Sequence, residues 1–434
     1  MSRNYDAVII GAGIIGACTA YELAKKGWRT LNLDKLPAAG YGSTGASCAI
    51  IRTHYSTLEG TALAYEGYHY WDDWANYIGV DDESGLAEYR NVGCIVMKTA
   101  ANDHLRSILE HQIHLGIPFE ELDADALRQR MPIFDLSLFG PPRSMRDPKF
   151  GEPVGGELAG AVLFSHAGYV TDPQLATHNV QRAAEAVGAE FRFNTEVREI
   201  RQAGGRVAGI TLSDGSAIDC PVVINVAGPH SSKINAMAGV LDDMTITTRA
   251  LRQEVVHVPS PKGFDFEADG YVFSDSDIGC YSRPELGNHI LIGSEDPECD
   301  EREWVDPDDF NREFTAQWET QVLREAQRIP TLPVTAPTRG VVDLYDVADD
   351  WIPIYDRSSL PGFYMAIGTS GNQFKNAPVA GVMMAELIEK CEAGHDHDSD
   401  PVRVRYRFTG REGNIGFFSR KREINRESSF SVLG

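Results

Sequence analysis

The sequence predicts an α/β protein of two domains, one of them built around a parallel sheet whose strands come from separate parts of the chain. Three observations support this fold class. A strand, a glycine-rich turn, a helix and a second strand open the chain between residues 6 and 34. Two further apolar runs that end in glycine follow much later, at 221–228 and 363–368. The sequence between them alternates short strand and helix patterns, which favours a second domain with a mixed sheet.

The first elements form a βαβ unit. The run at 6–10 is continuously apolar and is followed by glycine, which is typical of a strand buried on both faces of a parallel sheet. The pattern at 11–26 predicts a turn and a helix that packs on this strand, and 30–33 predicts the next strand, which ends at Asp34.

The turn of this unit has the spacing Gly11-x-Gly13-x-x-Gly16. In this context the first glycine permits a tight turn, the second lets the backbone approach a diphosphate, and the third lets the helix pack closely on the strand. The helix N-terminus offers backbone N–H groups to the diphosphate. Asp34, 18 residues beyond Gly16, is placed to bind a ribose hydroxyl. The sequence therefore predicts a dinucleotide site.

The remaining elements follow from their periodicity and from breaker residues. We expect helices at about 60–77, 102–115, 172–187, 308–328 and 378–390, with a further short helix before residue 133. We expect strands at 93–97, 190–193, 197–200, 206–212, 221–228 and 363–368, and several more within 250–295. Residues 137–157 are rich in Pro and Gly and predict a long loop.

This order of elements also indicates which dinucleotide binds, FAD or a nicotinamide dinucleotide. A nicotinamide-dependent dehydrogenase would continue with repeated βα units until its sheet is complete. This chain instead interrupts the pattern and returns to cofactor-like segments near 197–228 and 363–380, which favours FAD. We expect residues 1–90, 158–228 and 336–392 to form the FAD-binding domain and residues 91–157 and 229–335 to form the substrate domain. Residues 393–434 are expected to be a tail, with an exposed linker before a basic segment at Arg420 that is either a solvated helix or a docking element.

Composition narrows the classes of function. The 434 residues are 42% apolar and 24% charged, which is ordinary for a globular chain with room for two cores. A formal net charge of −23 argues against a nucleic-acid partner, because such binding needs a basic face. The seven cysteines have no metal-site or CxxC spacing, and no apolar stretch has the form of a signal peptide or a membrane span. We expect a cytoplasmic protein with reduced thiols, no metal, no nucleic acid and no membrane contact.

Several motifs resemble the D-amino-acid oxidase-like superfamily of FAD enzymes, and within it the branch of sarcosine oxidase and dimethylglycine dehydrogenase. They are DAVIIGAGIIGACTAYELAKKG, GYGSTGASCAIIRTHYS, VVINVAGPHS, CYSRPELGNHILIGSED, and YDVADDWIPIYD followed by FYMAIGTSGNQFKNAPVAG. The resemblance covers about residues 5–390. It implies a discontinuous Rossmann-like FAD-binding domain of the glutathione-reductase-like type together with a mixed-sheet substrate domain.

The resemblance also implies the positions that bind FAD. Residues 42–47 would pass along the flavin, Val197 would meet the adenine through its backbone, and residues 371–374 would approach the pyrimidine edge, where a backbone donor stabilises the reduced ring. The full set of implied cofactor positions is Gly11, Gly13, Ile14, Ile15, Gly16, Asp34, Lys35, Gly42, Ser43, Thr44, Ala46, Ser47, Val197, Ala227, Gly228, Gly371, Asn372, Gln373, Phe374 and Lys375.

Two cations and a tyrosine are the implied substrate residues. Arg52 matches a position where family members place a carboxylate-binding or flavin-facing arginine, and Lys375 matches a lysine that pairs with the substrate carboxylate in the sarcosine oxidase branch. Together they would hold a carboxylate by charge-assisted hydrogen bonds. Tyr345 matches a tyrosine that lines the substrate cavity. Each has a structural alternative: an ion pair for Arg52, a solvated helix start for Lys375, and a core position for Tyr345.

Four other residues are weaker candidates for the substrate pocket. Tyr281 and Arg283 share one face of an expected strand, and one of them would line the pocket. His54 and His289 have the chemistry of proton acceptors, although a lone histidine is more often structural.

The chain also departs from the family pattern. Asp343 stands where some relatives attach the flavin through cysteine, and the stretch at 169–173 lacks the histidine that another branch uses, so we expect non-covalent FAD. Leu291 stands where oxidases of the branch carry an oxygen-activating lysine. This difference leaves open whether electrons pass to oxygen or to another acceptor.

The expected reaction is oxidation of a small carboxylate-bearing amine, such as a sarcosine-, dimethylglycine- or N-alkyl amino-acid-like substrate. Hydride would pass to flavin N5 and the resulting imine would hydrolyse. The alternatives are oxidation of a 2-hydroxy acid or another C–O substrate, and an electron-relaying flavin subunit of a larger complex. The sequence is compatible with a homo-oligomer and with a hetero-oligomer.

Overall fold

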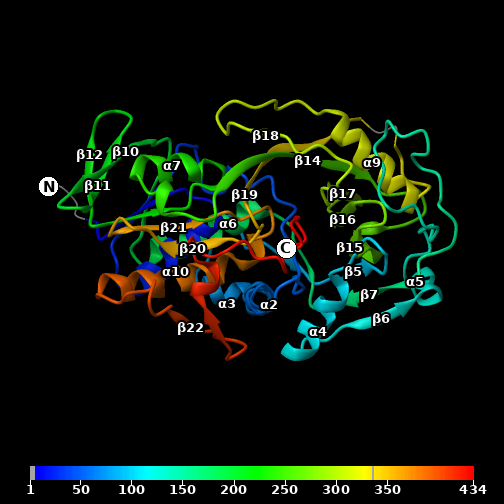
Figure 1. The fold of residues 1–434 in the computed structure, drawn as a ribbon, viewed down its shortest axis with the longest axis horizontal. Helices are drawn as coiled ribbons and strands as arrows, with labels where there is room; N and C mark the ends of the chain where they lie inside the picture. The colour runs from blue at the N-terminus through cyan, green and yellow to red at the C-terminus, as the bar shows by residue number, and fades with distance from the viewer. Residues whose placement is uncertain (1–4, 335–336) are drawn as a thin grey trace.

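The computed structural model describes residues 5–334 and 337–434, and two sheets dominate them (Figure 1). The first has six strands in the order β20-β21-β13-β1-β2-β9. They are β1 (Ala7–Ile10), β2 (Thr30–Leu33), β9 (Glu190–Arg192), β13 (Val222–Asn225), β20 (Ile354–Arg357) and β21 (Phe363–Ile367). All neighbours pair in parallel except β20, which is an antiparallel edge strand. The predicted parallel sheet of distant segments is therefore confirmed.

Both faces of this sheet are covered because alternate residues of each strand point to opposite sides. Ala7 and Ile9 pack into a core with α1 (Ile14–Lys25), α6 (Pro173–Ala186) and α10 (Ala377–Glu392). Val8 and Ile10 pack into a second core on the opposite face. That core includes α7 (Ser231–Ala238) and a small antiparallel sheet of β10 (Val197–Ala203), β11 (Arg206–Leu212) and β12 (Ala217–Asp219).

The second sheet has nine strands and mixed pairing. Along its order they are β18 (Trp304–Val305), β14 (Thr248–Pro259), β17 (His289–Ser294), β16 (Cys280–Glu285), β15 (Val272–Asp275), β5 (Cys94–Met97), β7 (Gly160–Phe164) and β6 (Glu120–Asp123), with β19 (Gly340–Ala348) paired along β14. α9 (Ala316–Arg328) packs on one face through Trp318 and Val322, and α4 (Leu105–Leu115) packs on the other through Leu105 and Ile108.

The remaining elements are a small sheet, several helices and a hairpin. A three-stranded sheet contains β3 (Ile50–Ile51), β8 (Gly168–Val170) and β4 (Tyr89–Arg90). The other elements are α2 (Leu58–Asp72), α3 (Trp74–Ile78), α5 (Ala124–Arg130), α8 (Phe266–Asp269), the hairpin of β22 (Arg403–Arg405) and β23 (Glu412–Asn414), and the 3-10 turns at Gly228–His230, Leu241–Asp243, Phe374–Asn376 and Ile415–Phe418.

Two predicted helices differ from the structure. The helix expected at 60–77 is two helices, α2 and α3, separated at Asp73. The helix expected from residue 308 begins only at Ala316, because the Thr315 hydroxyl caps it by accepting from the backbone N–H of Gln317 at 3.2 Å. The long loop expected at 137–157 contains no helix or strand. The domain boundaries remain a prediction, and the boundary at 335/336 lies outside the described residues.

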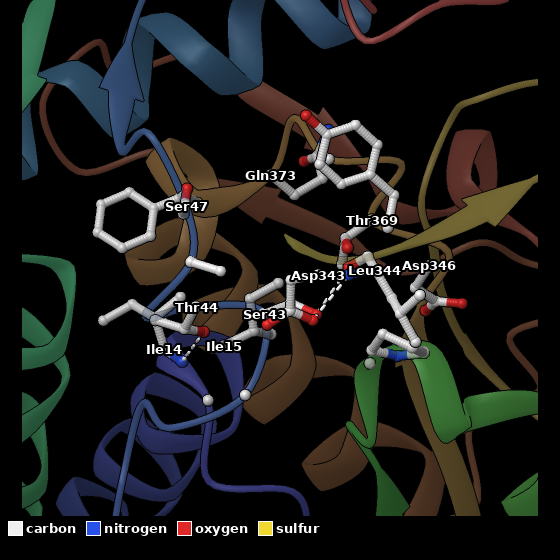
Figure 2. Close-up of a pocket in the computed structure, with 18 of the residues that line it drawn as sticks. Ile14, Ile15, Ser43, Thr44, Ser47, Asp343, Leu344, Asp346, Thr369 and Gln373 are labelled. Atoms are coloured by element: carbon white, nitrogen blue, oxygen red, sulfur yellow. Dashed lines mark hydrogen bonds between the residues drawn. The ribbon is translucent and has the colours of Figure 1, made fainter. Parts of the chain in front are cut away.

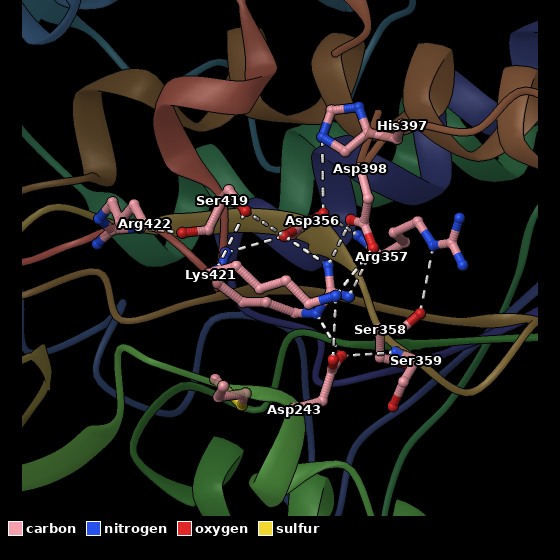
Figure 3. A network of polar contacts seen from close by, with 12 residues as sticks. Asp243, Asp356, Arg357, Ser358, Ser359, His397, Asp398, Ser419, Lys421 and Arg422 are labelled. Carbon is pink, nitrogen blue, oxygen red and sulfur yellow. Dashed lines mark hydrogen bonds and ion pairs between the residues drawn. The ribbon is translucent and has the colours of Figure 1, made fainter. Parts of the chain in front are cut away.

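The tail departs most from expectation, because its basic segment is neither a solvated helix nor a free docking element. Arg420 is fully buried and pairs with Asp243 (2.5 Å), Asp356 (2.9 Å) and Asp398 (3.0 Å). Figure 3 shows these three carboxylates in one network of polar contacts. Three carboxylates thus compensate the buried guanidinium and fix the tail against β20 and the 3-10 turn at Leu241–Asp243. In the part of the chain that the structure describes, no helix has the length and apolar character that a bilayer span requires.

Candidate functional site

One cavity of about 480 Å³ runs from the glycine turn to the boundary between the two large sheets. All of the predicted cofactor positions, from Gly11 to Lys375, lie along its wall. Arg52 and Tyr345 line it too. The fold therefore brings segments near residues 11, 42, 197, 227, 345 and 371 to a single site.

The glycine turn packs so closely against neighbouring backbone that it has no room for side chains. Gly11 has φ +109°, and a Cβ atom there would overlap the carbonyl oxygen of Val226. A Cβ atom at Gly16 would overlap the carbonyl oxygen of Gly11. Figure 2 shows the first turn of α1 beside the following loop, with the N–H of Ile14 donating to the Thr44 hydroxyl at 3.2 Å. The N-terminus of α1 thus lies at the cavity, where it suits a diphosphate.

Asp34 closes this end of the cavity. One carboxylate oxygen accepts from the N–H of Ala12 at 2.8 Å, and the other accepts from the N–H of Leu36 at 2.9 Å. Because a carboxylate accepts about four hydrogen bonds, Asp34 keeps capacity for ribose hydroxyls.

Ion pairs hold the loop between β18 and α9 at this edge of the cavity. Lys35 donates to Asp308 at 2.7 Å, and Lys233 donates to Asp306 at 2.5 Å and to Asp308 at 2.6 Å. Hydrogen bonds from Lys233 and Lys35 lower the pKa of Asp308. The loop between β18 and α9 is therefore held across the cavity by charge.

The loop at 42–49 passes along the middle of the cavity. The Ser43 hydroxyl donates to the carbonyl oxygen of Leu344 at 2.7 Å, which joins this loop to β19. Asp343 lies on the same wall, and burial raises its pKa. Its carboxyl group does not offer the thiol through which a cysteine at this position would attach the flavin.

Two buried cations meet at the far end. Arg52 and Lys375 are 6% and 3% exposed, and both lie over the ring of Tyr55, at 4.4 Å and 5.3 Å from its centre. Lys375 Nζ donates to the carbonyl oxygen of Asn372 at 2.6 Å and to the Tyr55 hydroxyl at 3.1 Å. Among the residues that the structure describes, no carboxylate lies within 4.0 Å of either cation. Burial and the neighbouring Arg52 hold the pKa of Lys375 well below its ordinary value.

Tyrosine hydroxyls form another part of this end of the cavity. The hydroxyls of Tyr345 and Tyr281 lie 3.2 Å apart, and Cys48 Sγ is 3.7 Å from the Tyr281 hydroxyl. Burial raises the pKa of Tyr281 well above its ordinary value. Arg283 does not line the cavity, since it pairs with Glu285 at 2.8 Å and lies over the ring of Tyr169.

The two candidate histidines have different positions. His54 lines the cavity, stacks on Phe164 at 4.4 Å, and has a buried Nδ1 without a hydrogen-bond partner. Burial, then Arg52 and Lys375, lower its pKa well below the ordinary value. His289 lies away from the cavity and packs against His257, and Leu291 packs into the apolar cluster behind Tyr281.

Sequence reasoning did not identify four residues of this site. Tyr55 belongs to a quoted motif, but a single tyrosine between His54 and Ser56 carries no chemical signal of its own. Cys48 precedes a strand and shows no motif of its own. Val432 and Leu433 lie in the tail, where the sequence carries no periodic signal, yet they line the cavity.

Comparison with known proteins agrees with this arrangement. A family model described as FAD dependent oxidoreductase matches residues 6–387. The chain is similar to sarcosine oxidase subunit beta from Rhodobacter capsulatus, with 26% identity over 89% of this chain and 86% of the relative. Glycine oxidase from Geobacillus kaustophilus is 24% identical over 91% of this chain and 96% of its own length.

The fold is likewise similar to solved structures. The crystal structure of L-proline dehydrogenase from P. horikoshii aligns with a TM-score of 0.73 at 21% identity, over 90% of this chain and 95% of that one. The matched family model spans both large sheets and every wall of the cavity except the segment at 432–433. The chain belongs to the FAD dependent oxidoreductase family, and it is an FAD-dependent oxidoreductase.

Proposed function

We propose that the protein oxidises a small amine that carries a carboxylate, such as a sarcosine-, dimethylglycine- or N-alkyl amino-acid-like substrate. The observation that carries this proposal is the pair of buried cations, Arg52 and Lys375, in the same cavity as the dinucleotide turn. A buried charge without a counter-charge is costly, so such a pair suits an anionic ligand.

The names of the relatives support the same class of substrate. Sarcosine, glycine and proline each carry a carboxylate on the carbon next to nitrogen, and they appear in the names of two curated relatives and one solved structure. A site for them needs a cationic end for the carboxylate and an apolar, dry end for the carbon that reacts.

The residues of the cavity divide this work. The turn at 11–16 and Asp34 would hold the diphosphate and ribose of FAD, and residues 42–47 and 371–374 would border its ring. FAD supplies a hydride acceptor for the carbon next to nitrogen. Arg52 and Lys375 bind the carboxylate and fix the orientation of that carbon, and the buried walls exclude water.

We further propose that FAD is bound without a covalent link. Asp343 lies on the wall of the cavity, where its carboxyl group offers no thiol for attachment. Trichloroacetic acid precipitation tests this, because non-covalent flavin stays in the supernatant and covalent flavin precipitates with the protein.

The test of the proposed reaction is anaerobic mixing of the purified protein with amino acids, N-alkyl amino acids and 2-hydroxy acids, while the visible absorbance of the flavin is followed. Bleaching by carboxylate-bearing amines is the expected result, and re-oxidation on admitting air then separates an oxidase from a dehydrogenase. Bleaching by 2-hydroxy acids alone, or by no compound of the panel, would contradict the proposal.

A larger assembly is the second part of the proposal. The similarity to a protein named as a subunit supports a hetero-oligomer, in which this chain would pass electrons to or from a partner. Gel filtration of the native protein, taken directly from its source, tests it: elution at the mass of one chain, 47.7 kDa, contradicts an assembly.

A further inference from the structure

Residues 429–434 fold back to the cavity, where Val432 and Leu433 reach the cation that the proposed function assigns to the substrate. Arg52 Nη1 donates to the carbonyl oxygen of His54, and Nη2 donates to the carbonyl oxygens of Val432 (3.1 Å) and Leu433. Val432 and Leu433 line the same cavity as Lys375. The tail is therefore a wall of the site.

These contacts occupy the part of Arg52 that a carboxylate needs. A guanidinium binds a carboxylate through two parallel N–H bonds, from both Nη atoms or from Nε and one Nη atom. Nη2 carries two hydrogens and donates to two carbonyls of the tail. Nη2 takes part in both arrangements, with Nε in one and with Nη1 in the other. Both two-bond arrangements are therefore blocked while the tail stays in place.

The tail is held by a small number of contacts. Val432 packs in an apolar cluster with Tyr281 and Trp351. Arg302 donates to the carbonyl oxygen of Phe430 at 2.9 Å, and the N–H of Ser56 donates to the carbonyl oxygen of Gly434 at 3.0 Å. Ser429 and Ser431 bond mainly to each other and to their own backbone.

We propose that residues 429–434 are the specificity-determining wall of the carboxylate site, whose carbonyl groups hold Arg52 until a substrate carboxylate displaces them. The inference rests on the proposed function. It implies that the tail limits the size of the substrate, because Val432 and Leu433 line the cavity and contact Arg52. Uncharged ligands gain nothing at Arg52 and do not displace the tail.

The test compares the full chain with a variant that ends at Ser428, using propionate and benzoate as probes and the perturbation of the flavin visible spectrum as the measure of binding. Removing the competing carbonyls should tighten propionate binding roughly tenfold, the order expected when one competing hydrogen bond to a charged group is lost. Benzoate should gain more than propionate, because the wall that limits size is gone. Glu427→Ala, at an exposed position just before the segment, is the matched control and should bind both probes like the full chain.

Two further measurements keep the test independent of the folding of the shortened chain. Val432→Ala should tighten propionate binding in the same direction by a smaller factor, since it loosens the apolar anchor. In the full chain, the amides of 431–434 should exchange with deuterium faster when propionate is added. Unchanged or weaker propionate binding in the shortened chain, or slower exchange with propionate, overturns the inference while leaving the proposed function intact. If no carboxylate perturbs the flavin spectrum of the full or the shortened chain, both fail.

Discussion

Replacing Lys375 with methionine tests the cationic site most directly. The change removes the ammonium while keeping a side chain of similar length in a position that is 3% exposed. A hydrogen bond to a charged group contributes about 1.5–3 kcal/mol, so the Kd of a carboxylate should rise roughly 10- to 150-fold. The KM of the substrate should rise by a similar factor, with a smaller effect on kcat, because the lost contact acts in the ground state as well as in the transition state.

The pH dependence of binding gives a sharper signature than the loss of affinity. Burial and Arg52 lower the pKa of Lys375, so the free protein favours the neutral amine at a lower pH than an exposed lysine would. A bound carboxylate favours the ammonium, and binding therefore takes up a proton. Affinity should be constant below the pKa of the free protein and should fall as pH rises through it, by about tenfold per pH unit. In Lys375→Met this fall should vanish.

The assay is the Kd of propionate from the flavin visible spectrum, measured in steps from about pH 5 to about pH 10, below the ordinary lysine pKa of about 10.4. Lys390→Met, an exposed lysine on α10, is the matched control and should keep the affinity and the pH profile of the unmodified protein. An unchanged Kd in Lys375→Met, or the same fall of affinity with pH, would show that Lys375 does not bind the carboxylate.

Three other changes probe the cofactor site and the stability of the fold. Gly11→Ala should abolish FAD retention, measured as the ratio of flavin to protein absorbance, whereas Gly151→Ala, also at positive φ (78°) but with open space around it, should keep the flavin. Arg420→Ala should lower the free energy of unfolding by about 3–5 kcal/mol, because it leaves buried carboxylates without a partner. Lys421→Ala is the control, since the Lys421 side chain is exposed. A loss of stability in Arg420→Ala no larger than in Lys421→Ala would contradict this prediction. Burial raises the pKa of Glu325 from 4.5 to about 8, so the folded protein keeps a proton that the unfolded chain releases, and stability falls as pH rises between these values. In urea unfolding, the free energy of unfolding of the unmodified protein should fall by about 1.4 kcal/mol per pH unit in this range, and Glu325→Gln should remove this fall. The same dependence on pH in both proteins would refute the raised pKa of Glu325.

The parts of the fold that sequence predicted well depend on local pattern. The βαβ unit at 7–33 could be identified because its strands are continuously apolar and its glycines have fixed spacing. The start of α9 could not, because Thr315 and the preceding polar residues have the same composition as a first helical turn. Its cap is visible only once the hydrogen bond to Gln317 is known.

In the site, too, some features could be predicted from the sequence and others depend on tertiary contacts. Arg52 and Lys375 follow from the resemblance to a family, but their common contact with Tyr55 is a tertiary feature that joins residues far apart in the chain. The prediction for the basic segment at Arg420 was wrong for a related reason. A basic residue near the end of a chain is usually solvated, and only the convergence of Asp243 and Asp356 makes its burial favourable.

The discontinuous order of the first sheet has a consequence for the synthesis of the protein. β1 lies between β2 and β13, and β13 lies between β1 and β21. At about 5–20 residues per second, Val222 leaves the ribosome on the order of 10–40 s after Ala7, and Phe363 later still. Throughout that interval the edge of β1 has no neighbour on one side, and an unpaired edge invites pairing with other chains. The nascent chain therefore carries an unpaired strand edge until β13 has been made, and the cavity walls at Tyr345 and Lys375 form only after most of the polypeptide has been made.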